Sequence, residues 1–156
     1  MIKKSKKVSD VWDKFREADG TIPADEPFQI WYFGNSQAMS VELADLVIAG
    51  TKTATASLLA MNELQPDTAP VIHGYSIVTD FEGEPKCIIR TVEVRHRPFE
   101  EVDAQFAFDE GEGDRTLEHW RKVHHDYFSR EATQHGMDFG PKSIICCERF
   151  RLLDHS

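Results

Sequence analysis

The stretch "LADLVIAGTKTATASLL", residues 43–59, decides the fold because it joins an amphipathic segment to a run of threonines and small residues. Its first half continues a helix that Ser36 can cap and that Gly50 ends. Lys52 follows this stop, with no acidic residue for several positions on either side. If the chain here forms a helical turn, Lys52 and Thr55 lie on one face and their side chains meet. The stretch therefore predicts a Lys52–Thr55 pair, and a surface lysine beside a capping threonine is the alternative.

The chain on either side of this stretch changes between helical and strand-like patterns. Apolar residues recur at helical spacing through residues 8–20, and residues 28–33 are aromatic and β-branched enough for a strand. Because regular βαβ alternation is lacking, we expect an α+β fold in which helices surround a small mixed or antiparallel sheet, partly closed into a barrel. The further elements expected are a short helix at 57–64, a hairpin of strands at 73–80 and 85–99, two helices within 99–136 that break at 110–113, and a final strand at 143–153.

The composition excludes several classes of protein. The net charge is −9, from 27 acidic and 18 basic residues, which argues against a protein that coats duplex DNA. The lysines at positions 3, 4, 6 and 7 are typical of a solvated tail. No apolar run is long enough for a membrane span and the first residues do not resemble a signal peptide, so we expect a cytoplasmic protein with no membrane partner. Cys87, Cys146 and Cys147 lack the spacing of a disulfide framework or of a zinc site.

Acidic residues gather in a second segment, "DEGEGDRT", residues 109–116. Carboxylates at this density raise one another's pKa, and the glycines let the backbone approach a substrate closely. One acid held protonated in this way can serve as a general acid, and a divalent cation such as Mg²⁺ is another means of relieving the repulsion. In the helix that follows, Trp120 and His124 share an apolar face with Tyr127. A histidine at such a position lines a core or a pocket.

Taken together, residues 43–59, the acidic segment and the closing "ICCERFRLL" resemble the activating signal cointegrator homology (ASCH) domain family, above all its larger bacterial members. The resemblance rests most on Gly50-x-Lys52-x-x-Thr55 and on the run 110–114 followed by Trp120 and His124. It implies a β-barrel of the pseudouridine-synthase-associated (PUA-like) type over residues 28–153. Residues 1–27 would then form an N-terminal basic tail and helix.

The resemblance also implies an activity. Some smaller relatives are amidohydrolases that deacylate acetylated cytidine, with the motif lysine activating the motif threonine and a glutamate assisting, while larger relatives are associated with cleavage of single-stranded RNA. We therefore expect Lys52, Thr55 and Glu110 to be catalytic, with Glu112 as the second match to the glutamate. An unpaired Lys52 amine would act either as a neutral base for Thr55 or as a fixed cation.

The substrate contacts are less well defined by the sequence. Small relatives carry an arginine two residues after the motif threonine, where this chain has Ser57. That substrate contact is therefore either missing or supplied by Arg90, Arg115 or another basic residue. Trp31, Tyr32 or Tyr75 offers a ring on which a base can stack. The expected substrate-binding residues are Ser57, Tyr75, Arg90, Glu112, Arg115, Trp120 and His124. We expect a hydrolase that cleaves single-stranded RNA. The alternatives are an amidohydrolase acting on nucleosides of the N4-acetylcytidine type and a non-catalytic RNA-binding module.

Overall fold

The computed structural model describes residues 5–156, so Lys3 and Lys4 of the predicted basic tail lie outside the described residues. Within these described residues there are five α-helices, five strands and two short 3-10 helices. The helices are α1 (Lys6–Asp19), α2 (Gln37–Ile48), α3 (Leu59–Leu64), α4 (Ala104–Glu110) and α5 (Leu117–Gln134), with η1 (Pro66–Thr68) and η2 (Phe99–Glu101). The strands are β1 (Phe28–Tyr32), β2 (Ala54–Leu58), β3 (Tyr75–Thr79), β4 (Pro85–Pro98) and β5 (Ile144–His155). None of the described helices is both long and apolar enough to cross a membrane.

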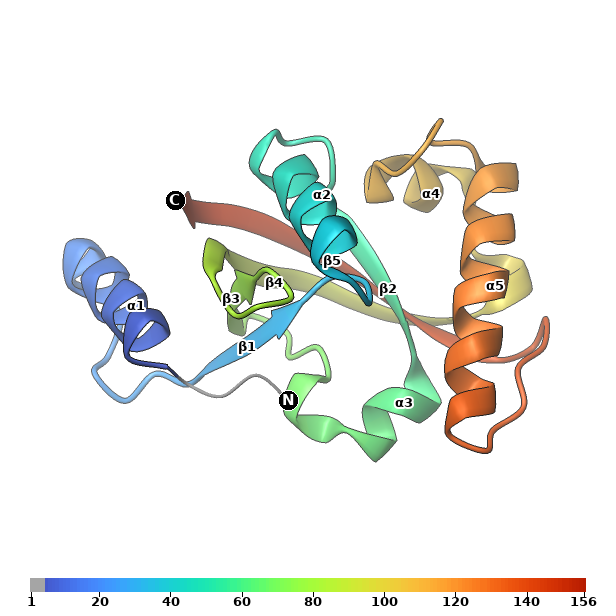
Figure 1. The fold of residues 1–156 in the computed structure, drawn as a ribbon, viewed down its shortest axis with the longest axis horizontal. Coiled ribbons are helices and arrows are strands. Elements are labelled where there is room, and N and C mark those ends of the chain that lie inside the picture. The colour runs from blue at the N-terminus through green and yellow to red at the C-terminus, as the bar shows by residue number, and fades with distance from the viewer. Residues whose placement is uncertain (1–4) are drawn as a thin grey trace.

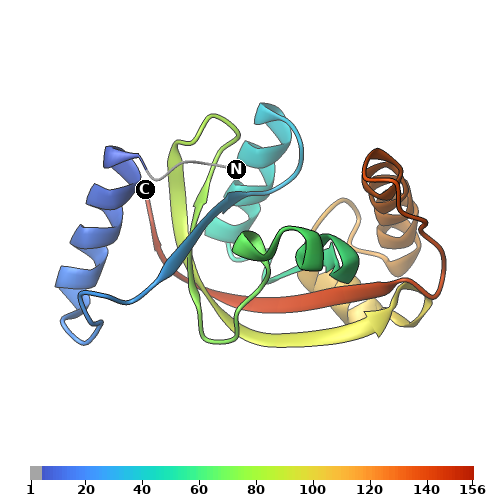
Figure 2. The same ribbon diagram turned by 90° about the horizontal axis from the view of Figure 1, so that it is seen from below.

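All five strands belong to one curled sheet in the order β1-β3-β4-β5-β2. β1 runs parallel to β3, and every other neighbouring pair is antiparallel. The two longest strands, β4 and β5, run side by side along the domain, as Figure 2 shows, and their pairing shifts register at two places. Such irregularities bend a strand and increase its twist, which lets the sheet curl into a half-barrel. The predicted α+β fold with a partly closed barrel is confirmed.

Helices cover both faces of the sheet and both of its ends. Ile77 and Ile88 pack under α1 with Trp12, whereas the neighbouring Val78 and Cys87 pack under α2. Successive side chains of a strand point to opposite faces, so α1 and α2 lie on opposite faces of this part of the sheet. A third cluster joins α4 and α5 to β2 and β5, at the end of the domain far from α1 (Figure 1).

The predicted helical turn around Lys52 is wrong. Residues Ala54–Leu58 form strand β2, which pairs antiparallel with β5 from Ala54↔Arg149 to Leu58↔Ile145. The alternation of Ala54, Ala56 and Leu58 with Thr55 and Ser57 suits a strand that packs one face against the core. Lys52 therefore precedes the strand, and Thr55 lies within it. Their spacing of three residues does not bring the two side chains together as it would on a helix.

Candidate functional site

A wide cleft lies between the two edge strands of the half-barrel. β1 and β2 are at opposite ends of the strand order, so each has one side that no other strand covers. Because the sheet curls, residues 30–32 of β1, with Phe33 and Gly34 just after it, face residues 55–57 of β2 across a cavity of about 590 Å³. The segment from α3 through η1 and the helix α5 close its sides. A cavity of this size is within the range that holds small-molecule ligands.

The cleft is lined by aromatic rings, hydroxyl groups and carboxyl groups. Trp31, Tyr32 and Tyr127 supply rings, while Asp67, Glu131 and Glu148 supply the acids. Among the described residues that line it, none is a lysine or an arginine. Burial raises the pKa of Glu131 and raises the pKa of Glu148 to about 7. The cleft therefore suits a ring that is uncharged or positively charged, and repels a phosphate group.

Thr55, Ser57 and Glu148 meet in this cleft through the pairing of β2 with β5. Thr55 is directly opposite Glu148 in the antiparallel ladder, so both side chains stand on one face of the sheet. The Oε2 atom of Glu148 accepts a hydrogen bond of 2.6 Å from the Thr91 hydroxyl. Ser57 Oγ accepts a hydrogen bond of 2.9 Å from the Asn62 amide. Two hydroxyls and one carboxyl group thus face the ligand space.

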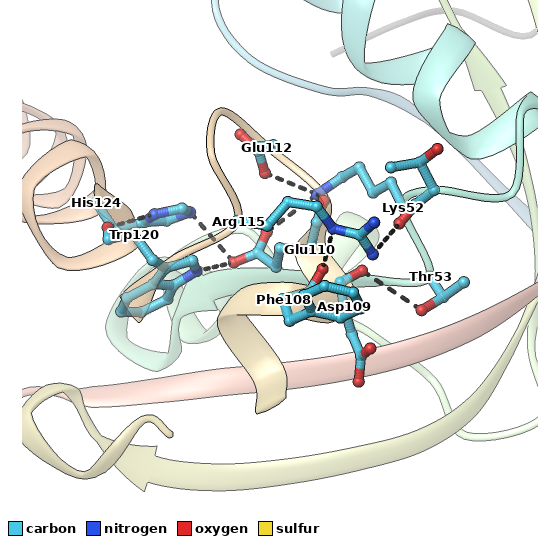
Figure 3. A network of polar contacts seen from close by, with 10 residues as sticks. Lys52, Thr53, Phe108, Asp109, Glu110, Glu112, Arg115, Trp120 and His124 are labelled. Atoms are coloured by element: carbon cyan, nitrogen blue, oxygen red, sulfur yellow. Dashed lines mark hydrogen bonds and ion pairs between the residues drawn. The ribbon is translucent and has the colours of Figure 1, made fainter. Parts of the chain in front are cut away.

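Lys52 belongs to a separate buried cluster beside the cleft (Figure 3). Its Nζ donates to Glu110 Oε1 at 3.0 Å, to Glu112 Oε2 at 2.8 Å and to the backbone oxygen of Glu110 at 3.3 Å. The other oxygen of the Glu110 carboxylate accepts from Trp120 Nε1 and lies 3.2 Å from His124 Nε2. Phe33 connects the cluster to the cleft. It lines the cavity, and the centre of its ring lies 5.3 Å from Lys52 Nζ.

The expectation of an unpaired Lys52 is wrong. An ammonium group has three N–H donors, and the three acceptors on Glu110 and Glu112 engage all of them. Burial alone would lower the pKa of Lys52, but the charges of the two glutamates outweigh it and raise the pKa. Lys52 is therefore a cation held in place, because a neutral amine would leave Glu110 buried without its partner.

The same contacts explain how the pKa values of the other members of this cluster are shifted. Burial would raise the pKa of Glu110, but Lys52 and His124 hold it far below its ordinary value. Burial would lower the pKa of His124, whereas the charge of Glu110 raises it. Burial raises the pKa of Glu112, and the charge of Lys52 offsets only part of that rise. Of the two candidate glutamates, Glu112 is therefore the one that gains a proton more readily.

Backbone contacts fix this cluster against the start of β2. Gly111 ends α4 with φ +73°, and a side chain there would meet the backbone oxygen of Thr51 at 2.5 Å. The Thr53 N–H donates to the Asp109 oxygen at 2.8 Å, and Arg115 Nε donates to the Phe108 oxygen at 2.9 Å. The glycine in "EGEG" is thus needed for the close approach of two backbone segments. Arg115 also lies near the backbone oxygen of Thr51 and acts here as a structural clamp.

Glu110, Glu112 and His124 resemble a set of metal ligands. One ligand atom from each lies within 4.8 Å of the others. However, the Lys52 ammonium group contacts both carboxylates and already supplies the positive charge that they need. A divalent cation would have to displace this buried ammonium group, so these residues do not fit Mg²⁺ while Lys52 is charged.

The predicted site residues lie in three different regions: the cleft, the buried Lys52 cluster and the contact between α1 and the sheet. Thr55 and Ser57 line the cleft, whereas Lys52, Glu110, Glu112, Trp120 and His124 form the buried cluster. Tyr75 and Arg90 lie apart from both. The Tyr75 ring packs against Trp12 under α1, and the Arg90 guanidinium lies 4.8 Å from the centre of that ring. They therefore stabilise the contact between α1 and the sheet, and they do not line the cleft.

Sequence reasoning missed Glu148 and Glu131, which both line the cleft. Glu148 lies in a strand-like run between a cysteine and an arginine, where nothing distinguishes it from a solvated glutamate. Its position opposite Thr55 depends on the register of β2 against β5, which pairs residues far apart in the chain. Glu131, by contrast, lies seven residues after His124, on the helix face that the sequence already assigns to His124 and Tyr127, so its position could have been predicted.

Fold and site together define a half-barrel domain with one cleft between its edge strands, and the chain belongs to the ASCH domain family. The family model described as "ASCH domain" matches residues 29–154. The predicted resemblance is thereby confirmed. No curated protein matches the chain at a significant level.

Solved structures agree with this assignment. The chain is similar to an ASCH domain from Lactobacillus crispatus JV V101, with 26% identity and a TM-score of 0.87 over 97% of this chain and 96% of that chain. It is also similar to the protein EF3133 from Enterococcus faecalis V583, with 31% identity and a TM-score of 0.86 over 96% of this chain and 90% of that chain. The hypothetical protein PH0355 shares the fold alone, at 15% identity and a TM-score of 0.54 over 81% of this chain and 98% of that chain.

Proposed function

We propose that this protein is a hydrolase that removes an acyl group from an amino-substituted nucleobase or nucleoside, such as N4-acetylcytidine, in the cleft between β1 and β2. One observation carries the proposal: the cleft combines aromatic rings, several hydroxyl groups, among them those of Thr55 and Ser57, and three carboxyl groups, with no basic side chain among the described residues that line it. Family membership supports an activity of this class.

The proposed ligand fits the chemistry of the cleft. Rings such as Trp31 and Tyr127 offer surfaces on which a base can stack. Carboxyl groups accept hydrogen bonds from exocyclic amino groups, as acidic side chains do with the amino group of cytosine. Thr55, half-buried in the cleft, is the proposed nucleophile, and Ser57 is a proposed hydrogen-bonding residue.

In this proposal Lys52 and Glu110 act as positioning residues. Their ion pair joins the end of α4 to the residues that lead into β2, two positions before the strand begins. Holding this junction fixes the depth and direction of Thr55 in the cleft. A shift of about 1 Å in a reacting group can cost about 100-fold in rate, so a remote clamp of this kind matters for catalysis.

Cleavage of single-stranded RNA, the activity that the sequence predicts first, fits this cleft less well. Phosphate groups bind where lysine or arginine side chains neutralise them, and carboxyl groups repel them. The same argument applies to a non-catalytic RNA-binding module. Both activities would require a phosphate-binding surface outside the cleft.

A substrate comparison tests the proposal. Purified wild-type protein is incubated with N4-acetylcytidine, with its 5′-monophosphate and with a short single-stranded RNA, and products are separated by liquid chromatography. We expect release of acetate from the nucleoside, weaker release from the monophosphate and no RNA fragments. Thr55→Val abolishes turnover, while Thr53→Val is the matched control because Thr53 is exposed and does not line the cleft. RNA cleavage that survives Thr55→Val would contradict the proposal.

A further inference from the structure

A nucleophilic threonine needs a group that takes its proton, and the buried cluster does not provide one. Lys52 is protonated and uses its three donors on Glu110 and Glu112. Glu110 in turn is held by Lys52, Trp120 and His124, and it does not line the cleft. The base for Thr55 must therefore be sought among the groups that share the cleft with it.

Glu148 has the position that such a base requires. It faces Thr55 directly across the β2–β5 ladder, where opposite Cβ atoms are about 4.5–5.5 Å apart. It is only 5% exposed, yet it lines the cleft. The Thr91 hydroxyl holds its Oε2 at 2.6 Å, and within residues 5–156 no hydrogen bond engages the Oε1 atom. One oxygen thus orients the carboxyl group while the other is open toward the ligand space.

The surroundings of Glu148 keep its two protonation states close in free energy. Burial raises its pKa to about 7, while the hydrogen bond from Thr91 and the positive charge of Lys52 limit that rise. The other titratable groups around this cleft are Tyr32 of β1, Asp67 of η1, Tyr127 and Glu131 of α5 and, next to Glu148 in β5, Cys146. None of these groups carries a positive charge. A general acid–base is most effective when it titrates near the working pH.

We propose that Glu148 is the catalytic residue that transfers protons for Thr55, an inference that rests on the proposed hydrolase function. Glu148 Oε1 takes the proton of the Thr55 hydroxyl as Oγ1 bonds to the amide carbon. The proton then passes from Glu148 to the leaving nitrogen as the C–N bond breaks, which releases the amine and leaves an ester on Thr55. Glu148 next takes a proton from a water molecule that attacks this ester. The C–O bond to Thr55 breaks, Thr55 regains a proton, and a carboxylic acid leaves.

Rate measurements across pH test this assignment. For wild type we expect kcat/KM to rise about tenfold per pH unit below about 7 and to level off above it, because Glu148 acts in its ionised form. Glu148→Gln keeps the shape and the acceptor for Thr91 but cannot take a proton, so kcat/KM falls about 100- to 10,000-fold and the remaining rate loses this inflection. Glu148→Asp retains part of the rate with the inflection still present. Glu93→Gln is the matched control, since Glu93 lies on the same sheet, pairs with Arg95 and Arg149, and does not line this cleft.

A second measurement separates failure of this inference from failure of the proposed function. Acylation of Thr55 by p-nitrophenyl acetate is followed by the release of p-nitrophenolate and by mass spectrometry of the peptide. If wild type does not turn over acylated nucleosides, the proposed function is wrong, but slow acylation in Glu148→Gln and fast acylation in wild type would still support the role of Glu148. A Glu148→Gln protein that is folded by circular dichroism and acylates at the wild-type rate would overturn it. Absence of acylation in wild type would overturn both proposals.

Discussion

Replacing Lys52 with methionine isolates the energy of the buried cluster. Methionine preserves much of the length of the side chain and removes its charge, so Glu110, itself only 1% exposed, keeps its carboxylate with Trp120 and His124 as its remaining partners. Removing one member of a buried ion pair costs about 3–5 kcal/mol, because the other charge is left uncompensated. We therefore expect the free energy of unfolding at pH 7 to fall by about that amount.

Urea denaturation followed by tryptophan fluorescence measures this change. Lys142→Met is the matched control, because Lys142 Nζ lies 2.9 Å from Glu100, much like the 3.0 Å from Lys52 to Glu110, but at the exposed surface. We expect that control to leave the free energy of unfolding nearly unchanged, since exposed ion pairs contribute little. The reasoning is refuted if the two substitutions have equal effects. It is also refuted if Lys52→Met costs as much in a Glu110→Gln background as it does alone.

Further predictions concern Glu148, Gly111 and His124. Glu148→Gln makes the protein more stable than wild type at pH 8 by about 3 kcal/mol. The reason is that wild type loses stability between about pH 4.5 and 7, where the carboxyl group of Glu148 stays protonated in the folded state but is ionised in the unfolded chain. Thermal melts at pH 8 that show no gain for Glu148→Gln would contradict this. Gly111→Ala lowers the melting temperature more than Gly20→Ala does. Both glycines have a positive φ, but only at Gly111 would the added methyl group clash with the backbone of Thr51. Equal losses in melting temperature would argue against this close approach of the two backbone segments. The pKa of His124 is raised in the folded protein, so its stabilising contact with Glu110 is lost as the pH rises above about 6.5. His124→Gln should therefore make the free energy of unfolding fall less steeply with pH in this range. An equally steep fall in the variant would exclude the contact.

The sequence predicts those parts of the fold that depend on local patterns. Ser36 caps α2 as expected, and the break at residues 110–113 separates α4 from α5. Apolar spacing along α5 correctly places His124 beside Trp120 on the buried face. These features follow from capping, glycine and helical periodicity, all of which act over a few residues.

The parts that sequence alone predicts wrongly depend on distant pairing. Thr55 lies in a strand because β5, about ninety residues later in the chain, pairs with it, as the Thr55↔Glu148 register shows. Lys52 has no acidic neighbour in sequence, yet Glu110 and Glu112 reach it in space through the close approach at Gly111. The isolated lysine was a correct signal of an unusual position, but the inference that it lacks a carboxylate partner was wrong. Tertiary contacts that overrule a local preference are expected near functional sites.

An NMR titration of the Thr55→Val protein with N4-acetylcytidine tests the central claim most directly, because this variant should bind the substrate without consuming it. If the ligand occupies the cleft, amide chemical shifts should change together in residues 30–33, 55–57 and 127–131, with little change around Tyr75. Saturable changes confined to those three segments are the predicted result. Changes centred on another surface, or no changes at millimolar nucleoside, would contradict the assignment of this cleft as the site.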